Sequence, residues 1–301
     1  MRNIESYKPE IKVARELPRG FRRPKKSSGK HLHIKDDPKV VIRAIYYTVS
    51  TIALVGLVVF SAYKIIRWQA ESDVTNQTIA KLQSETEVKT ISKTPTVSEI
   101  KTPENQRYLD MDLIDVDLSP LRQTNPNAIG WINVPGTSIN YPYVQAADND
   151  FYLYHTFDGH WSDAGWVFLD YRNNKSLTDK NQIIYAHGRI DGSMFGSLQN
   201  VLDESWFNNE DNRVVKISND ETSTLWQVFS VYRIPKTNDY ITTNFSDPSE
   251  FKGFIKMIQD RSLFNFKTPV EDTDRILTLS TCIGTNDRAV LHAKLIKLIE
   301  K

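Results

Sequence analysis

The sequence predicts a mainly β domain, a barrel or a sandwich with peripheral helices, that one N-terminal helix attaches to a membrane. From about residue 108 onward, short runs of aromatic and β-branched residues alternate with turn signals. Only one clear amphipathic helix pattern interrupts them, and near the N-terminus twenty consecutive residues carry no charge. Many short strands with few helices favour a β architecture over an alternating α/β one.

The expected strands follow one another through the second half of the chain. Residues 130–145 contain two short strands around the Pro135-Gly136 turn. Further strands are expected at 164–170, 182–187, 213–218, 224–233, 274–281 and 289–299. A short helix is expected at 194–202.

The clear helix pattern begins at Asp247. Asp247 can act as the N-cap, Pro248 suits the first helical position, and Glu250 stands where a capping box places its acid. Four apolar residues then fall at helical spacing and form one stripe: Phe251, Phe254, Ile255 and Ile258. The sequence therefore predicts a helix that packs one face against the strands.

The uncharged stretch, Ala44–Tyr63, is long enough for a helix to cross the roughly 30 Å hydrocarbon core of a bilayer. A cleaved signal peptide fits poorly, because the charged region ahead of it is about forty residues long and the apolar run exceeds the usual 7–15. Residues 1–43 carry 13 Lys and Arg against 5 Asp and Glu, a net of +8, whereas the remaining 258 residues carry 25 against 32, a net of −7. The positive cluster predicts a cytoplasmic N-terminus.

Four segments are therefore expected: a basic cytoplasmic tail at 1–43, a membrane anchor at 44–66, an extracellular stalk or linker at 67–107, and a folded extracellular domain at 108–301. The linker is expected because residues 68–107 are polar and rich in Thr, Ser, Glu and Lys. The basic tail is better explained by topology and contact with anionic lipid headgroups than by nucleic-acid binding. No nucleic-acid partner is expected.

Cys282 is the only cysteine of the chain, so it cannot form an internal disulfide. A free thiol outside the cell is liable to oxidation. It follows directly after the predicted strand 274–281, and Arg288 comes six residues later, where a guanidinium can favour the thiolate and bind a carbonyl oxygen. From the residues alone, a nucleophile and a small buried side chain remain about equally good readings.

A thiol nucleophile needs a base, and His187 is the best placed of the six histidines. It ends the predicted strand 182–187 and precedes Gly188, which repeats the position of Cys282 at the end of its strand. His155 and His160 have a spacing that suggests a metal pair, but no further ligand pattern surrounds them, so no metal site is expected. His292 alternates along the last strand and is expected to be a packed core residue.

At this point the residues match a known family. The run TLSTC, which ends at Cys282, followed by Arg288 resembles the sortase signature TLxTC…R, and residues 120–298 are similar to class B sortases along almost their whole length. The resemblance implies an eight-stranded sortase β-barrel with peripheral helices. It also implies a cysteine transpeptidase (a thiol protease in its cleavage half) on the Gram-positive cell surface, held by a single-pass anchor and needing no cofactor.

The resemblance also implies the roles of three residues. Cys282 attacks the Thr carbonyl of a C-terminal sorting motif of the LPxTG or NPxTN type, and a thioacyl-enzyme forms. His187 serves as general acid and then as base, while Arg288 orients the substrate and supports the oxyanion. The partners are then exported proteins that bear the motif and an amine, either from a cell-wall peptide cross-bridge or from a pilin lysine.

The same resemblance implies a groove for the sorting motif. Its expected residues are Asn149, Leu153, Tyr240, Ile241, Ser280 and Thr281. Ordinary barrel packing is the competing interpretation for these residues. The loop between Cys282 and Arg288 is short for the class, so its substrate contacts are expected to differ. No Asp-Pro-aromatic lid precedes the barrel, which disfavours a pilin polymerase without excluding it. Pilin polymerisation, simple hydrolysis and a non-catalytic, membrane-tethered binding module stay open as alternatives.

Overall fold

The structure is a computed structural model that describes residues 38–93, 95–98, 105–283 and 286–301, with the backbone only at Cys282 and Ile283. Most of the expected basic tail, residues 1–37, lies outside this description. The chain divides into two units, 1–59 and 60–301, each of which is described by itself.

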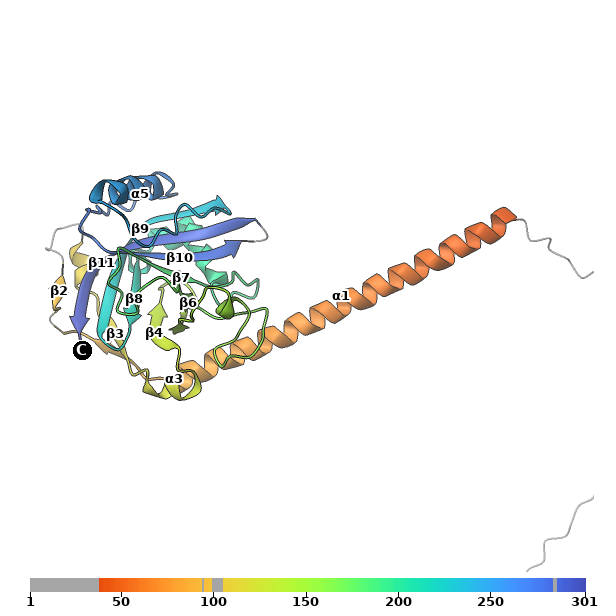
Figure 1. Cartoon of the computed structure of the whole chain (residues 1–301), viewed down its shortest axis with the longest axis horizontal. Helices are drawn as coiled ribbons and strands as arrows, with labels where there is room; N and C mark the ends of the chain where they lie inside the picture. The colour runs from red at the N-terminus through yellow and green to blue at the C-terminus, as the bar shows by residue number, and fades with distance from the viewer. Residues whose placement is uncertain (1–37, 94, 99–104, 284–285) are drawn as a thin grey trace, which may run out of the picture. The chain divides into compact units, whose positions relative to one another are not determined.

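Eight strands close into a barrel within the second unit. They are β4 (Ala128–Asn133), β5 (Asn140–Val144), β6 (Phe168–Leu169), β7 (Asn181–Tyr185), β8 (Val214–Ser218), β9 (Thr222–Pro235), β10 (Ile276–Ile283) and β11 (Asp287–Glu300). Their order is β10-β7-β6-β5-β4-β8-β9-β11, and a further β10–β11 pairing closes the ring (Figure 1). Pairs β5–β6 and β7–β10 are parallel and the other barrel pairs are antiparallel. The eight-stranded barrel is confirmed.

Three short strands lie outside the barrel. Strand β1 (Val88–Ile91) pairs with β3 (Leu113–Val116), and β2 (Val97–Ser98) pairs with the C-terminal end of β11. Short helices connect the strands: α2 (Gln106–Leu109), α3 (Ser119–Thr124), η1 (Phe151–Leu153), η2 (Gly196–Leu202), α4 (Glu204–Asn208) and η3 (Glu210–Asn212). The helix expected at 194–202 is thus the 3₁₀ helix η2.

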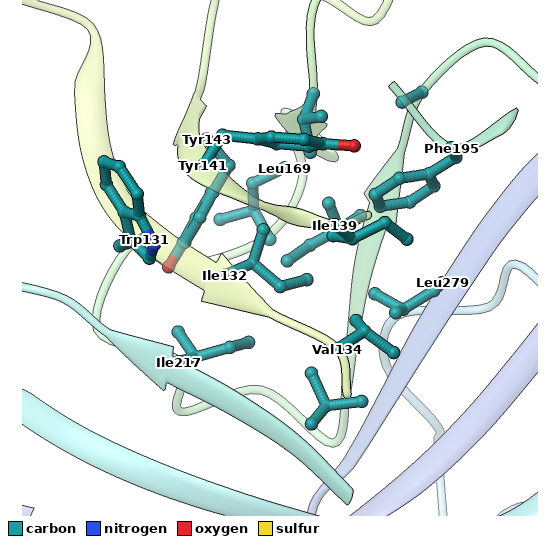
Figure 2. Close-up of a cluster of buried hydrophobic side chains, with 14 of the residues drawn as sticks. Trp131, Ile132, Val134, Ile139, Tyr141, Tyr143, Leu169, Phe195, Ile217 and Leu279 are labelled. Carbon is teal, nitrogen blue, oxygen red and sulfur yellow. The ribbon is translucent and has the colours of Figure 1, made fainter. Parts of the chain in front are cut away.

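Large apolar side chains fill the barrel interior, as Figure 2 shows. Fully buried members come from several strands, among them Trp131 and Ile132 of β4, Tyr141 of β5, Ile217 of β8 and Leu279 of β10. Burial of each such side chain contributes about 1.5–3 kcal/mol. This packed interior holds the strand ends rigidly, which is what a catalytic site mounted on them needs.

Helix α5 (Pro248–Asp260) lies beside β9 and covers one side of the barrel (Figure 1). The predicted cap is confirmed, because the Asp247 carboxylate accepts hydrogen bonds from the Ser249 and Glu250 N–H groups. Glu250 binds one residue earlier than a capping box would place it, accepting from the N–H and hydroxyl of Ser246. The predicted stripe is buried: Phe251, Phe254, Ile255 and Ile258 pack against Phe229, Tyr232, Ile276 and Val290.

The strand expected at 164–170 shrinks to β6, Phe168–Leu169. Gly165 has a left-handed φ of 58°, and the Trp166 N–H donates to the Tyr152 carbonyl at 2.8 Å. The first half of the expected strand is therefore bound to the 149–163 loop, and its hydrogen bonds are not available for a sheet.

Helix α1 (Pro38–Glu85) continues well past the expected anchor. Among the described residues, it is the one helix long and apolar enough to cross a membrane. Residues 67–85, expected to be a linker, are helical and pack on the barrel: Ser72, Thr75 and Leu82 are buried, and Leu82 joins the barrel core cluster. Most residues of this part of the helix are exposed, and most of the exposed ones are polar, whereas only a narrow stripe of it is buried. The segment boundaries themselves stay predictions.

Candidate active site

Three neighbouring strands bring the expected catalytic residues to one edge of the barrel. Strands β7 and β10 run parallel, with Tyr185 paired to Ser280. This is the last pair of the parallel register: His187 lies two residues past the end of β7, and Cys282 lies two residues after Ser280 within β10. Across the antiparallel β10–β11 pair, Cys282 is the register partner of Arg288. Cys282 and Arg288 are therefore neighbours, and His187 follows the strand that pairs with β10 on its other side.

A backbone carbonyl orients the imidazole of His187. Its Nε2 atom lies 2.7 Å from the carbonyl oxygen of Leu153. A carbonyl oxygen can only accept, so Nε2 carries the hydrogen and donates it. Nδ1 is then the ring nitrogen left for proton transfer.

The loop that supplies the Leu153 carbonyl depends on a glycine. A Cβ atom at Gly165 would lie 2.5 Å from the carbonyl oxygen of Tyr152 and 2.8 Å from that of Leu153. The left-handed φ of Gly165 also favours glycine. The acceptor of the His187 hydrogen bond is thus held by a close backbone contact that only glycine permits.

The chain after His187 is braced by helix α1. The Arg189 guanidinium is buried, donates to the Ser72 hydroxyl at 2.5 Å and lies 3.3 Å from the Asp191 carboxylate. The Phe195 N–H donates to the His187 carbonyl at 3.0 Å. These contacts fix the backbone at and after His187.

A cavity of about 250 Å³ opens beside these residues. Its lining includes His187, Arg288 and all six residues expected to form the groove: Asn149, Leu153, Tyr240, Ile241, Ser280 and Thr281. The structure thus brings these residues together, and their roles toward a substrate stay predictions. A larger hollow of about 1210 Å³ lies around residues 262–271 and contains none of them.

Sequence reasoning missed the rest of the lining. These residues are Asp150, Phe168, Tyr185, Ala186, Lys236, Thr237 and Asn238. Tyr185 and Ala186 directly precede His187, so their position next to the expected base was an available signal. Residues 236–238 follow the end of β9, where the sequence pattern is only that of a loop.

Several groove residues are already bound within the protein. Tyr240 is 2% exposed and its hydroxyl lies 2.9 Å from the Ser280 hydroxyl. The Asn149 amide donates to Asp170 at 3.1 Å and accepts from the Tyr171 N–H at 3.0 Å. The Thr281 hydroxyl is buried without a hydrogen-bond partner among the described residues. The cavity wall is therefore largely pre-formed.

A buried carboxylate, Asp170, stands behind this wall. Burial by itself would raise the pKa of the Asp170 carboxyl, but hydrogen bonds from Arg172 outweigh it and bring the pKa below its usual value. Burial, followed by the charge of Asp170, raises the pKa of Tyr185. The carboxylate is thus ionised and the phenol neutral at physiological pH.

His292 is fully buried, which confirms the expected packed residue. Thr278 donates to the Asn181 side chain at 2.7 Å, so its oxygen accepts from His292 Nδ1 at 2.9 Å, and Nε2 accepts from the Tyr232 hydroxyl at 2.8 Å. Burial lowers the pKa of His292 to about 3, and the charge of Arg261 adds to this. The imidazole is therefore neutral.

The other two histidines of interest lie on the 149–163 loop. His155 stacks on the Phe151 ring at 4.0 Å, and His160 Nε2 lies 3.6 Å from the Asp158 carboxylate. Within the described ranges, no three side chains of the His, Cys, Asp and Glu types gather into a set that could hold a metal ion.

This chain is similar to several known proteins. A family model described as a sortase domain matches residues 132–296. Sortase B of Listeria monocytogenes is 30% identical over 250 residues, which cover 82% of this chain and 95% of the relative. The crystal structure of sortase B from B. anthracis in complex with AAEK1 is 34% identical, with a TM-score of 0.62, and the match covers 76% of this chain and 99% of that one. A Staphylococcus aureus sortase B–substrate complex is 33% identical, with a TM-score of 0.56 over 60% of this chain and 84% of that one.

Proposed function

Given that this chain belongs to the sortase family, as a class B cysteine transpeptidase, we propose that it cuts a C-terminal sorting motif of exported proteins and joins them to an amine of the cell wall. The motif is of the LPxTG or NPxTN type, cut after its Thr. The observation that carries the proposal is that Cys282 is the register partner of Arg288, while Arg288 and His187, two residues past the end of β7, line the same groove.

In the first half-reaction, the Cys282 thiolate attacks the Thr carbonyl carbon. The Arg288 guanidinium donates to the oxygen that becomes negative, where a planar, permanently charged donor is most effective. The carbon–nitrogen bond then breaks, and His187 gives a proton from Nδ1 to the leaving amine. The other ring nitrogen, Nε2, keeps its proton and its hydrogen bond to the Leu153 carbonyl, so the ring stays oriented.

In the second half-reaction, an amine attacks the thioester carbonyl. His187 Nδ1 takes the proton that this nitrogen must lose, the new amide forms, and Cys282 leaves as the thiolate. The enzyme ends in its starting protonation state, so the cycle requires no cofactor. Water in place of the amine would give hydrolysis, which is the competing outcome.

The anchor places this chemistry at the cell surface. In the proposed topology, residues 1–43 are cytoplasmic, residues 44–66 cross the membrane once, and the barrel is extracellular. The charge asymmetry of the chain supports this orientation. Labelling of Cys282 in whole cells by a membrane-impermeant thiol reagent tests it, since an inward-facing barrel would stay unlabelled until the cells are broken.

The decisive experiment incubates the full chain, in detergent micelles, with peptides that contain either motif. Mass spectrometry is expected to show a thioacyl adduct on Cys282 that is absent from Cys282→Ala. Addition of triglycine as amine is expected to release a peptide–triglycine product. Wild-type protein that forms no adduct with any motif would refute the proposal, and an adduct that yields only free acid would indicate a hydrolase.

A further inference from the structure

The Asp170 carboxylate is fully buried and accepts hydrogen bonds from three residues. The N–H of Arg172 donates at 2.9 Å, and the guanidinium of the same residue donates to both carboxylate oxygens at 2.9 and 2.7 Å. The Tyr185 hydroxyl donates at 3.0 Å and the Asn149 amide at 3.1 Å. An ionised carboxylate can receive this many donors without leaving a polar group unsatisfied.

The residues that this network connects lie in different walls of the cavity. Asn149 lies in the loop after β5, and Tyr185 ends β7. The Arg172 guanidinium also donates to the Ile241 carbonyl at 3.0 Å, and Ile241 lies in a third wall of the cavity. Asp170 itself is not part of the lining. One buried charge thus connects three lining residues from segments that are distant in the chain.

We propose that Asp170 is a positioning residue that sets the width of the sorting-motif groove by holding Asn149, Tyr185 and Ile241 in fixed relation. The proposal rests on the proposed transpeptidase function. Asp170 acts through Arg172 and Tyr185 and contacts neither the peptide nor the reacting atoms. Loss of the connection therefore weakens peptide binding and leaves the chemical step at Cys282 nearly unchanged.

A second carboxylate–arginine pair shows why Asp170 is distinctive. Asp239 and Arg261 also form a paired contact that fixes the loop after β9, but the Asp239 side chain is 43% exposed, whereas that of Asp170 is fully buried. Among the described residues, the hydrogen bonds of this pair reach neither Asn149 nor Tyr185. Asp170 joins the loop to the opposite walls, whereas Asp239 only joins it to the end of α5.

The test measures peptide turnover by Arg172→Gln, Tyr185→Phe and Asp170→Asn in the full chain. Arg172 is 37% exposed, so its replacement is expected to fold even if Asp170→Asn does not. Arg172→Gln is expected to raise KM for the sorting peptide about tenfold and to change kcat less than about twofold, the pattern of lost ground-state binding. Tyr185→Phe is expected to show the same pattern with a smaller rise in KM. The Asp170→Asn and Arg172→Gln double variant is expected to match Asp170→Asn alone, because both act through one connection.

Asp220→Asn is the matched control, since it breaks the Arg122–Asp220 pair near a separate hollow. Unchanged KM in Arg172→Gln, a fall in kcat at constant KM, or an equal KM rise in Asp220→Asn would each overturn the proposal. Hydrogen exchange gives a readout that does not depend on turnover: amides of residues 239–243 are expected to exchange faster in Arg172→Gln than in wild type, and unchanged exchange contradicts the connection. A wild type without a thioacyl adduct refutes the transpeptidase function separately.

Discussion

Cys282 and Arg288 are register partners across the antiparallel β10–β11 pair. Partners of this kind have Cα atoms about 4.5–5.5 Å apart. The short connection between the two strands therefore places a guanidinium-bearing residue beside the proposed nucleophile without a long loop. The Arg288 Nη1 atom donates to the Asp287 carbonyl at 3.1 Å, so the side chain is held at the cavity edge.

Arg288→Lys tests whether the planar fork matters beyond its charge. Lysine keeps the positive charge but loses the arrangement of donors suited to a carbonyl oxygen. We expect kcat/KM for the sorting peptide to fall about 10²-fold, the magnitude typical of a lost oxyanion donor. Arg107→Lys, at an exposed pair with Asp211, is the control and is expected to retain full activity. Equal activities of the two variants would contradict the assigned role.

Gly165→Ala tests the support of His187. The added methyl group would meet the Tyr152 carbonyl at 2.5 Å and must displace the Leu153 carbonyl that accepts from His187. We expect kcat/KM to fall at least about tenfold, because small misplacements of a catalytic group are costly. Gly159→Ala is the control: Gly159 also has a left-handed φ, of 81°, but open space around it. The same loss of activity in both variants would mean that backbone strain alone explains it.

His292 makes the folded state sensitive to mild acid. Its pKa is lowered from the ordinary 6.5 to about 3, so the unfolded chain takes up a proton that the native protein refuses. The free energy of unfolding is therefore expected to decrease as pH falls from about 6.5 toward 3, by about 1.4 kcal/mol per pH unit for this group. Urea unfolding of residues 60–301 at pH 7, 6 and 5 measures it.

His292→Gln is the matched variant for this measurement. It is expected to be less stable at pH 7, because Tyr232 and Thr278 lose their imidazole partner, but its stability should change less between pH 7 and 5. Carboxylates contribute little in this range, since most titrate near pH 4. Parallel stability curves for wild type and variant would show that another group causes the acid sensitivity.

Leu82→Ala tests whether the helix after the membrane anchor belongs to the folded domain. Leu82 is 5% exposed and lies in the barrel core cluster, so its truncation is expected to lower the free energy of unfolding by about 2–4 kcal/mol. Val74→Ala, at a position on the same helix that is 56% exposed, is expected to change it by less than about 0.5 kcal/mol. A flexible linker would make both changes neutral.

Local patterns in the sequence predicted much of this protein. The cap at Asp247 and the stripe from Phe251 to Ile258 depend only on spacing within one helix, and both are confirmed. The strands are likewise visible as short apolar runs. The polar composition of residues 67–85 indicated a linker, whereas the structure shows a helix with a narrow buried stripe. That stripe is buried against residues that are distant in the chain, so the local composition does not reveal it. This helix packs on a barrel that is formed by other parts of the chain.

The sequence by itself determined the chemical groups at hand: one thiol in Cys282, a histidine at a strand end in His187, an arginine six residues after the thiol, and an apolar segment able to span a membrane. Only the tertiary structure decided how they meet. The parallel β7–β10 pairing places Tyr185, two residues before His187, opposite Ser280, two residues before Cys282, and the Leu153 carbonyl accepts the hydrogen of the imidazole Nε2. The contacts of Asp170 were equally hidden. Residue type and spacing indicate what chemistry a side chain can perform. Pairing between distant strands determines which groups lie within a few ångströms of one another, and hydrogen bonds and proton transfers require such short distances.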